Sequence, residues 1–70
     1  MFGAVALLIL LIVGTSTKSF ADATNNAVAK AARTVRNMSW FEVVEMRGSI
    51  KDGKVNQFQV TVKIGFPLDG

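Results

Sequence analysis

The sequence lacks three of the side chains on which catalytic and metal sites most often depend. Its 70 residues include no cysteine, no histidine and no tyrosine, and only one tryptophan and one proline. Without cysteine there is no disulfide framework and no thiolate ligand, and without histidine the usual imidazole ligand and general base are missing. Zinc, haem and catalytic-triad chemistry are therefore excluded, and we expect no metal site.

Charge of either sign is sparse as well. Eight lysine and arginine residues against five aspartate and glutamate residues give a net charge of +3, and the positive charges are scattered along the chain. Because they form no basic stripe, we expect no nucleic-acid partner. The length suits one domain, residues 1–70, but a domain of this size buries only about 60% of the surface of its unfolded chain. We therefore expect the subunit to be stabilised by assembly with further copies of the chain.

An unbroken apolar run, Ala4–Val13, opens the chain and has three interpretations. The run has only about half of the ~20 residues that a membrane-spanning helix needs, so we expect no membrane span. The length also suits the core of a signal peptide, with small residues at Phe20–Ala23 for cleavage, although no lysine or arginine precedes the run. The third interpretation is a strand over about residues 4–13 that is buried on both faces. Its second face would then need a neighbouring chain.

After this run the apolar residues recur at three- and four-residue spacing, which predicts a helix over about residues 19–36. The apolar stripe comprises Phe20, Ala23, Ala27, Val28, Ala31, Val35 and Met38. Ser19, three residues before Asp22, is a variant of the capping box that starts helices. Arg33 and Arg36 would complement the negative end of the helix dipole.

The remainder of the chain is predicted to be a hairpin, with strands over about residues 39–50 and 54–67. Apolar and polar residues alternate in Val60–Ile64, so alternate residues from Phe58 to Phe66 form a core face. Lys51–Gly53 is expected to form a three-residue turn, because glycine suits its left-handed position. A strand, a helix and a hairpin together predict an α+β fold.

The first strand of this hairpin does not alternate cleanly. Strict alternation from Trp40 would bury the charges of Glu45 and Arg47, which is too costly. We therefore predict a β-bulge at Val43-Val44 that turns both valines inward. The expected pairs are then Arg47 opposite Gln57, Glu45 opposite Gln59 and Trp40 opposite Lys63. The polar face of the hairpin would carry Trp40, Glu42, Glu45, Arg47, Gln57, Gln59, Thr61 and Lys63.

This polar face is the candidate binding site. Trp40 offers a rigid aromatic platform for a planar ligand, and the amide of Gln59 matches the edge of a heterocycle. Glu45 suits sugar-like hydroxyls and Arg47 suits a phosphate. The candidate contacts are Trp40, Gln59, Glu45, Arg47, Val44 and Gln57. No nucleophile is placed beside a base, so we expect that the protein is not an enzyme.

Several segments together resemble the dodecin family over about residues 13–68. They are Val13–Ser16, the alanine-rich helix, Trp40–Gly48, Asp52–Val55 and Phe58–Phe66. The resemblance implies a βαββ subunit whose three-stranded antiparallel sheet packs on one helix, a hollow shell of twelve copies, and flavins bound in pairs at two-fold interfaces. It also implies cytoplasmic flavin storage and protection, without turnover.

In that family a tryptophan at the place of Trp40 sandwiches the isoalloxazine, and a glutamine at the place of Gln59 bonds its edge. An acidic residue at the place of Glu45 lies near the ribityl chain. The ligand is riboflavin, flavin mononucleotide (FMN) or a lumichrome-like product, and the sequence does not select among them. Many members carry arginine where Pro67 stands, which leaves Arg47 as the main phosphate contact.

Two other interpretations stay open. Dodecins commonly open with a strand carrying Tyr, Lys and Glu, where this chain has Leu7, Leu8 and Leu11. A purely structural or engineered cage, assembled through this apolar strand and holding no flavin, is one alternative. A secreted small protein with a cleaved signal peptide is the other.

Overall fold

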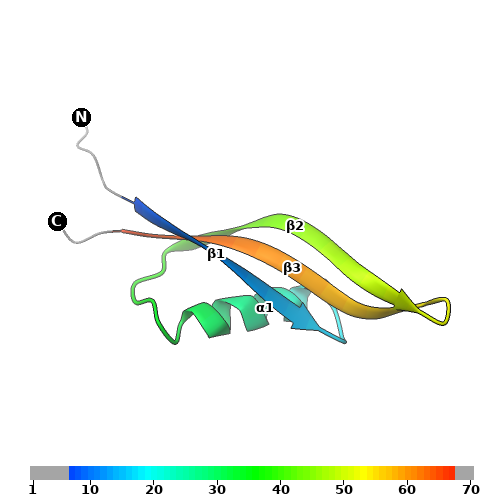
Figure 1. The fold of residues 1–70 in the computed structure, drawn as a ribbon. Coiled ribbons are helices and arrows are strands. Elements are labelled where there is room, and N and C mark those ends of the chain that lie inside the picture. The colour runs from blue at the N-terminus through cyan, green and yellow to red at the C-terminus, as the bar shows by residue number, and fades with distance from the viewer. Residues whose placement is uncertain (1–6, 68–70) are drawn as a thin grey trace.

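The computed structural model describes residues 7–67 and shows one helix against one side of a three-stranded antiparallel sheet (Figure 1). The elements are β1 (Leu7–Ser16), α1 (Phe20–Ala31), β2 (Trp40–Lys51) and β3 (Lys54–Pro67). The predicted α+β class and βαββ order are confirmed. The first strand reaches Ser16 rather than residue 13, and its expected start at residue 4 lies outside the described residues.

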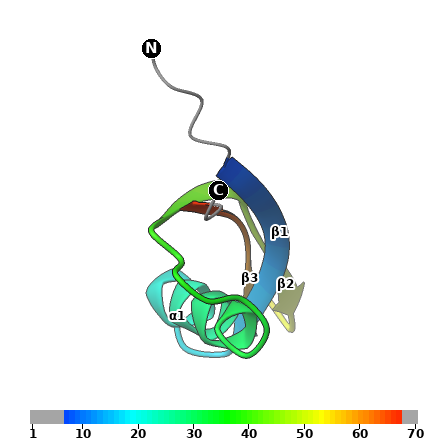
Figure 2. The same ribbon diagram turned by 90° about the vertical axis from the view of Figure 1, so that its left-hand side faces the viewer.

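The central strand of the sheet is β3, in the order β1-β3-β2, and the sheet curves around the helix (Figure 2). Helix α1 packs mainly on β1 and β3, and β2 is left largely exposed. The buried core is accordingly small and comprises Ala23, Ala27, Ala31, Val60, Val62 and Ile64. The predicted alternation in β3 is confirmed by the last three of these residues.

A close approach between α1 and β1 explains why the helix face is built from alanine. Gly14 of β1 lies against the helix backbone, where an added Cβ would overlap the Ala23 carbonyl oxygen and Ala27. Glycine marks strand positions where another backbone approaches closely. At Gly14 the helix therefore lies directly on the backbone of the strand.

The helix begins as the sequence predicts. Ser19 is the N-cap, and its hydroxyl accepts a hydrogen bond from the backbone N–H of Asp22 at 2.9 Å. The Asp22 carboxylate does not return to the N-cap, because it accepts from the Ser16 hydroxyl at 2.7 Å. That hydroxyl in turn accepts from the backbone N–H of Lys18 at 2.8 Å, which fixes the connection from β1 to α1.

The helix ends at Ala31, five residues before the predicted end at residue 36. Its last turn tightens through hydrogen bonds between residues three apart, from the backbone N–H of Thr34 to the Ala31 carbonyl at 3.1 Å. Asn37 then adopts a left-handed φ of 61° that reverses the chain toward β2. Arg33 and Arg36 therefore lie in the connection, and the basic residue of the last turn is Lys30.

The apolar run forms strand β1, which supports the strand interpretation. Leu10 and Ile12 face the core, whereas Ile9, Leu11 and Val13 are exposed on the opposite face. At the free edge of β1, Lys30 and Asn26 of the helix donate to the Val13 and Thr15 carbonyls, both at 2.9 Å. Cleavage at Phe20–Ala23 would remove this strand and cut the first turn of α1.

The hairpin closes with a two-residue turn rather than the predicted three-residue loop. Lys51 pairs with Lys54, and Asp52 and Gly53 both have positive φ, 54° and 76°. An Asp-Gly pair with these angles forms the type I′ turn that matches the twist of a hairpin. The hairpin extends past the helix and β1 as a projecting arm (Figure 1).

The bulge predicted at Val43-Val44 is confirmed as a register shift between Val43 and Glu45. The predicted pairs are nevertheless wrong by two residues, because of the shorter turn and a second shift between Ser49 and Ile50. The actual pairs are Arg47 opposite Gln59, Glu45 opposite Thr61, Glu42 opposite Lys63 and Trp40 opposite Gly65. A displacement of two residues preserves the faces, so the predicted polar face is correct.

Candidate functional site

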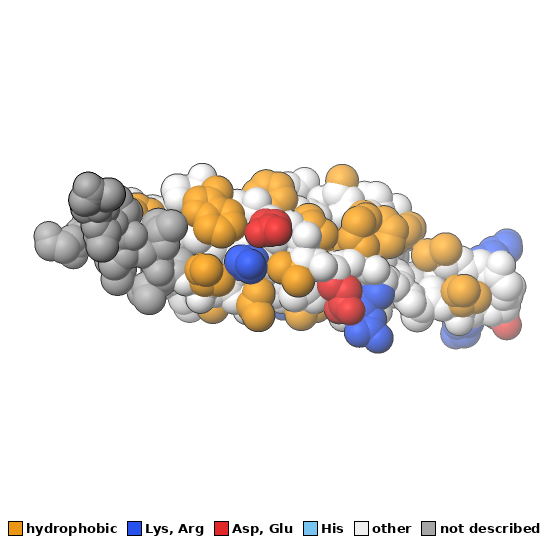
Figure 3. All heavy atoms as spheres, turned by 90° about the horizontal axis from the view of Figure 1, so that it is seen from above, with side chains coloured by type: hydrophobic (Ala, Val, Ile, Leu, Met, Phe, Trp, Pro, Cys, Tyr) orange, Lys and Arg blue, Asp and Glu red, His pale blue; other side chains and the backbone are white. Residues whose placement is uncertain are grey.

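The candidate site is the outer face of the sheet, on the side away from α1. Cross-strand partners form four successive rows on this face, each written in the order β2, β3, β1. They are Trp40-Gly65-Ile9, Glu42-Lys63-Leu11, Glu45-Thr61-Val13 and Arg47-Gln59-Thr15. Seen from this side, acidic and basic side chains meet at two places among hydrophobic ones (Figure 3).

Trp40 occupies one end of this face, at the first residue of β2. Its side chain leans over Gly65, because a Cβ added to Gly65 would overlap the Cε2, Cζ2 and Nε1 atoms of the indole. The residue is 38% exposed, whereas Gly65 beneath it is buried. The indole therefore packs on its own sheet at Gly65 and still exposes surface that a ligand can contact.

Arg47, Gln59 and Glu45 come together two to three rows away from the indole. Gln59 lies directly opposite Arg47, whose Nη1 is 3.6 Å from the Glu45 Oε1. The two charged side chains are 63% and 54% exposed, and an ion pair so exposed is held only weakly. Both groups are therefore available to bond a ligand.

A second acid–base pair separates this cluster from the tryptophan. The Lys63 Nζ lies 3.7 Å from the Glu42 Oε1 across the two strands. Lys63 was predicted to lie opposite Trp40, but it faces Glu42 because the register differs. The positive charge nearest to the indole along β3 is therefore paired with a carboxylate at nearly the same distance as Arg47 is with Glu45.

The structure does not bring all the candidate contacts together within one chain. Gln59 is six residues along β3 from the partner of Trp40, which corresponds to about 20 Å along an extended strand. Gln57 lies a further two residues away, opposite Ser49, and Val44 is the extra residue of the bulge. A planar ligand can therefore contact Trp40 and Gln59 together only if they belong to different copies of the chain.

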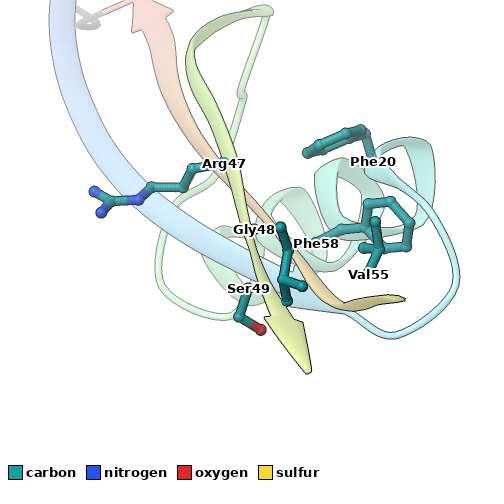
Figure 4. A pocket seen from close by; sticks show the side chains of 7 residues that line it. Phe20, Arg47, Gly48, Ser49, Val55 and Phe58 are labelled. Atoms are coloured by element: carbon teal, nitrogen blue, oxygen red, sulfur yellow. The ribbon is translucent and has the colours of Figure 1, made fainter. Parts of the chain in front are cut away.

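A separate pocket of about 220 Å³ lies near the projecting arm and does not coincide with this site. Its apolar lining includes Phe20, Ile50, Val55 and Phe58, and the two phenylalanine rings meet edge to face with centroids 4.9 Å apart. Arg47 of β2 also borders this pocket, but its guanidinium points away from Phe58 and Val55 (Figure 4).

Two further features concern only the described residues 7–67. Their acidic side chains nowhere gather in a group of three that would suit a metal ion. Within the same range, α1 is too short and too polar to cross a bilayer.

Gly65 is the site residue that reasoning from sequence missed. It interrupts an otherwise alternating strand between Ile64 and Phe66. A glycine inside a strand pattern often marks a close approach by another group, so the signal was present. The group that approaches Gly65 could be identified only from the actual register, which places the indole of Trp40 above it.

Comparisons with known proteins agree with this architecture. The sequence model of the dodecin family matches residues 8–69. A dodecin from Thermus thermophilus is 41% identical over 58 residues, covering 83% of this chain and 84% of that protein.

Solved structures give the same result. The dodecin from Streptomyces coelicolor superimposes with a TM-score of 0.87 at 42% identity, over 93% of each chain. The dodecin from Streptomyces davaonensis gives a TM-score of 0.86 at 43% identity, over 93% of this chain and 96% of the other. By sequence and by fold, this chain belongs to the dodecin family.

Proposed function

We propose that the chain binds a flavin and stores it in the cytoplasm, in a shell of twelve copies, without catalysing a reaction. The observation that carries this proposal is the accessible indole of Trp40, seated on Gly65 at the outer face of the sheet. Aromatic stacking adds about 0.5 to 1.5 kcal/mol beyond the burial of area. A flat tricyclic ring system gains the most from such a platform.

Polar groups on the same face suit the rest of a flavin. The Gln59 amide offers one donor and one acceptor to the edge of the ring system, whose N–H and C=O groups alternate. The weakly paired Glu45 suits the hydroxyls of the ribityl chain, and Arg47 suits a terminal phosphate. Val44 and Gln57 are proposed as flanking contacts, because they neighbour this cluster along β2 and β3.

The separation of about 20 Å between Trp40 and Gln59 makes the assembly part of the proposal. Each flavin would contact Trp40 of one copy and Gln59 of another, across an interface that relates the two sheets. Exposed apolar side chains on both sides of the sheet, among them Leu11 and Phe41, supply surface that further copies would bury.

Storage is favoured over turnover by the chemistry of the site. The sequence has no histidine and no cysteine, and none of the candidate contacts is a nucleophile beside a base. A ring system enclosed between indoles also leaves little room for a second substrate. Steady oxidation of a reduced nicotinamide with added flavin would contradict this part of the proposal.

A riboflavin titration of the purified chain tests the proposal. Riboflavin fluorescence should be quenched saturably by the wild type, and Trp40→Ala should abolish the quenching because the platform is lost. Asn25→Ala is the control, since it changes an exposed residue of α1, on the side of the sheet away from the site, and should leave the affinity unchanged. Light scattering verifies that each variant keeps its oligomeric state.

Two outcomes would contradict the proposal. If the wild type forms an oligomer that never quenches riboflavin, the chain is a structural cage without flavin. If intact mass shows that the purified chain lacks its first twenty-odd residues, the secreted alternative holds instead. Because that cleavage would delete β1, it would also remove the exposed apolar side chains of Ile9, Leu11 and Val13.

A further inference from the structure

We propose that Gly65 is a positioning residue for the stacking tryptophan, which it holds in a binding orientation by leaving room for part of the indole. The binding part of this inference rests on the proposed flavin function. The orientation of the indole does not, and it can be measured without any ligand.

The backbone does not require glycine at this position. Gly65 lies inside β3 with no positive φ, in contrast to Gly53 in the turn, whose φ is 76°. Glycine weakens the interior of a strand, so its presence needs another reason. That reason is space, because an added Cβ would overlap the Cε2, Cζ2 and Nε1 atoms of Trp40.

The surrounding hydrogen bonds fix Gly65 relative to the tryptophan. The Gly65 carbonyl accepts from the backbone N–H of Ser39 at 3.0 Å and from its hydroxyl at 3.2 Å. Ser39 immediately precedes Trp40, which itself pairs with Gly65 in the ladder. The Cα atoms of both residues are therefore held in place, and the indole cannot avoid an added side chain by a shift of the strand.

The overlapping atoms belong to a rigid ring, so relief requires a different rotamer of Trp40. A new rotamer would lift the indole from the sheet and change the surface that it presents. Because Ile9 of β1 flanks Gly65 on the other side, the indole currently lies in an apolar row. Lifting it out of this row exposes it to water.

The test uses the entire 70-residue chain and its single tryptophan, whose emission reports on Trp40 alone. Gly65→Ala should shift this emission to longer wavelength and increase its quenching by acrylamide. Riboflavin binding should weaken by roughly three- to tenfold, the range expected when part of an aromatic stacking contact is lost. Thr61→Ala, on the same face of the same strand, should leave the emission unchanged.

A double-mutant cycle separates positioning from a general effect on the strand. In the Trp40→Phe background the smaller ring leaves space, so adding Gly65→Ala should change riboflavin affinity by less than about twofold. If Gly65→Ala alone does not fold, Trp40→Phe/Gly65→Ala should restore folding. Failure of both variants to fold, or equal effects in both backgrounds, would overturn the inference.

Tryptophan emission and riboflavin affinity, measured together, distinguish failure of the positioning role of Gly65 from failure of the proposed flavin function. If the wild type binds no riboflavin but Gly65→Ala still shifts the emission, the positioning role holds and the proposed function fails. If the wild type binds riboflavin and Gly65→Ala changes neither the emission nor the affinity, the function holds and the positioning role is wrong.

Discussion

Individual side chains divide the outer face of the sheet into an aromatic end and a polar end. Trp40 at one end offers stacking, and Arg47 with Gln59 at the other offers hydrogen bonds. Both cations pair with a glutamate at a similar distance, 3.6 Å for Arg47 and 3.7 Å for Lys63, but the Arg47 side chain is 63% exposed and the Lys63 side chain only 35%. This difference makes Arg47 the main candidate for contact with a phosphate.

Arg47→Ala should therefore weaken the binding of FMN more than that of riboflavin. A charge-assisted hydrogen bond at an exposed position corresponds to about tenfold in affinity, and riboflavin has no phosphate to lose it. Titrations of both flavins against wild type and variant measure the effect. Lys51→Ala, the same change of charge near the turn, is the control and should affect both flavins equally.

An equal loss of riboflavin and FMN affinity in Arg47→Ala would contradict this role. It would indicate that the guanidinium contacts the ring system or supports the assembly instead.

Secondary-structure elements show how the small subunit makes its core. Helix α1 contributes only alanines to the buried core, and Gly14 of β1 allows it to lie directly on the sheet. The packing is therefore sensitive to any added volume between these two elements. Cores without spare space respond to extra methyl groups with strain or shifts of backbone.

Gly14→Ala should lower the free energy of unfolding by about 1 to 3 kcal/mol, because its methyl group would overlap the Ala23 carbonyl and Ala27. Urea denaturation at a fixed concentration of protein measures the loss, since assembly makes stability depend on concentration. Thr15→Ala in the same strand is exposed and should have little effect. Equal stability of the two variants would show that the helix can move away freely.

The elements could be predicted from sequence because each carries a local signal. The period of the apolar residues located the helix and strands, Ser19 marked the start of α1, and the cost of burying Glu45 and Arg47 located the bulge. The end of the helix was misplaced, since the apolar spacing continues to Met38 while the chain already turns at Asn37. The spacing of apolar residues alone does not show where the chain reverses direction.

The register depended on one sequence signal that was misinterpreted, the Asp52-Gly53 pair typical of a type I′ turn, and on a second shift that the alternation of residues does not carry. The type I′ turn at Asp52-Gly53 and the second shift at Ser49 moved every partner by two residues. The candidate contacts were therefore placed on the correct face but in the wrong rows. Whether Trp40 meets Gln59 depends on how copies of the chain are arranged, which no local signal describes.

The subunit is elongated, with extents of 54 × 23 × 13 Å, and several groups of apolar side chains among residues 7–67 are exposed. They include Ile9, Leu11 and Val13 on the outer face of β1, Phe41, Val43 and Met46 on the other face of β2, and Ile50 and Val55 on the arm. Patches of this kind mark interaction surfaces. Together with the divided site, they favour an assembly in which the copies complete one another.

Mixed assemblies test whether two copies share each site. Trp40→Ala and Gln59→Ala should each bind riboflavin weakly or not at all as pure proteins. When the two are unfolded, mixed and refolded together, interfaces between unlike copies contain one intact pair, so part of the wild-type quenching should return. Refolding each variant separately and mixing afterwards is the control. No recovery in the co-refolded sample would contradict a shared site.

The most direct test of the account is the crystal structure of the protein soaked with riboflavin. We predict an isoalloxazine ring about 3.5 Å from the indole of Trp40, which is van der Waals contact, with the amide of Gln59 from a second copy at the ring edge. A flavin bound elsewhere, or a Trp40 indole buried against its own subunit with no ligand beside it, would contradict the account.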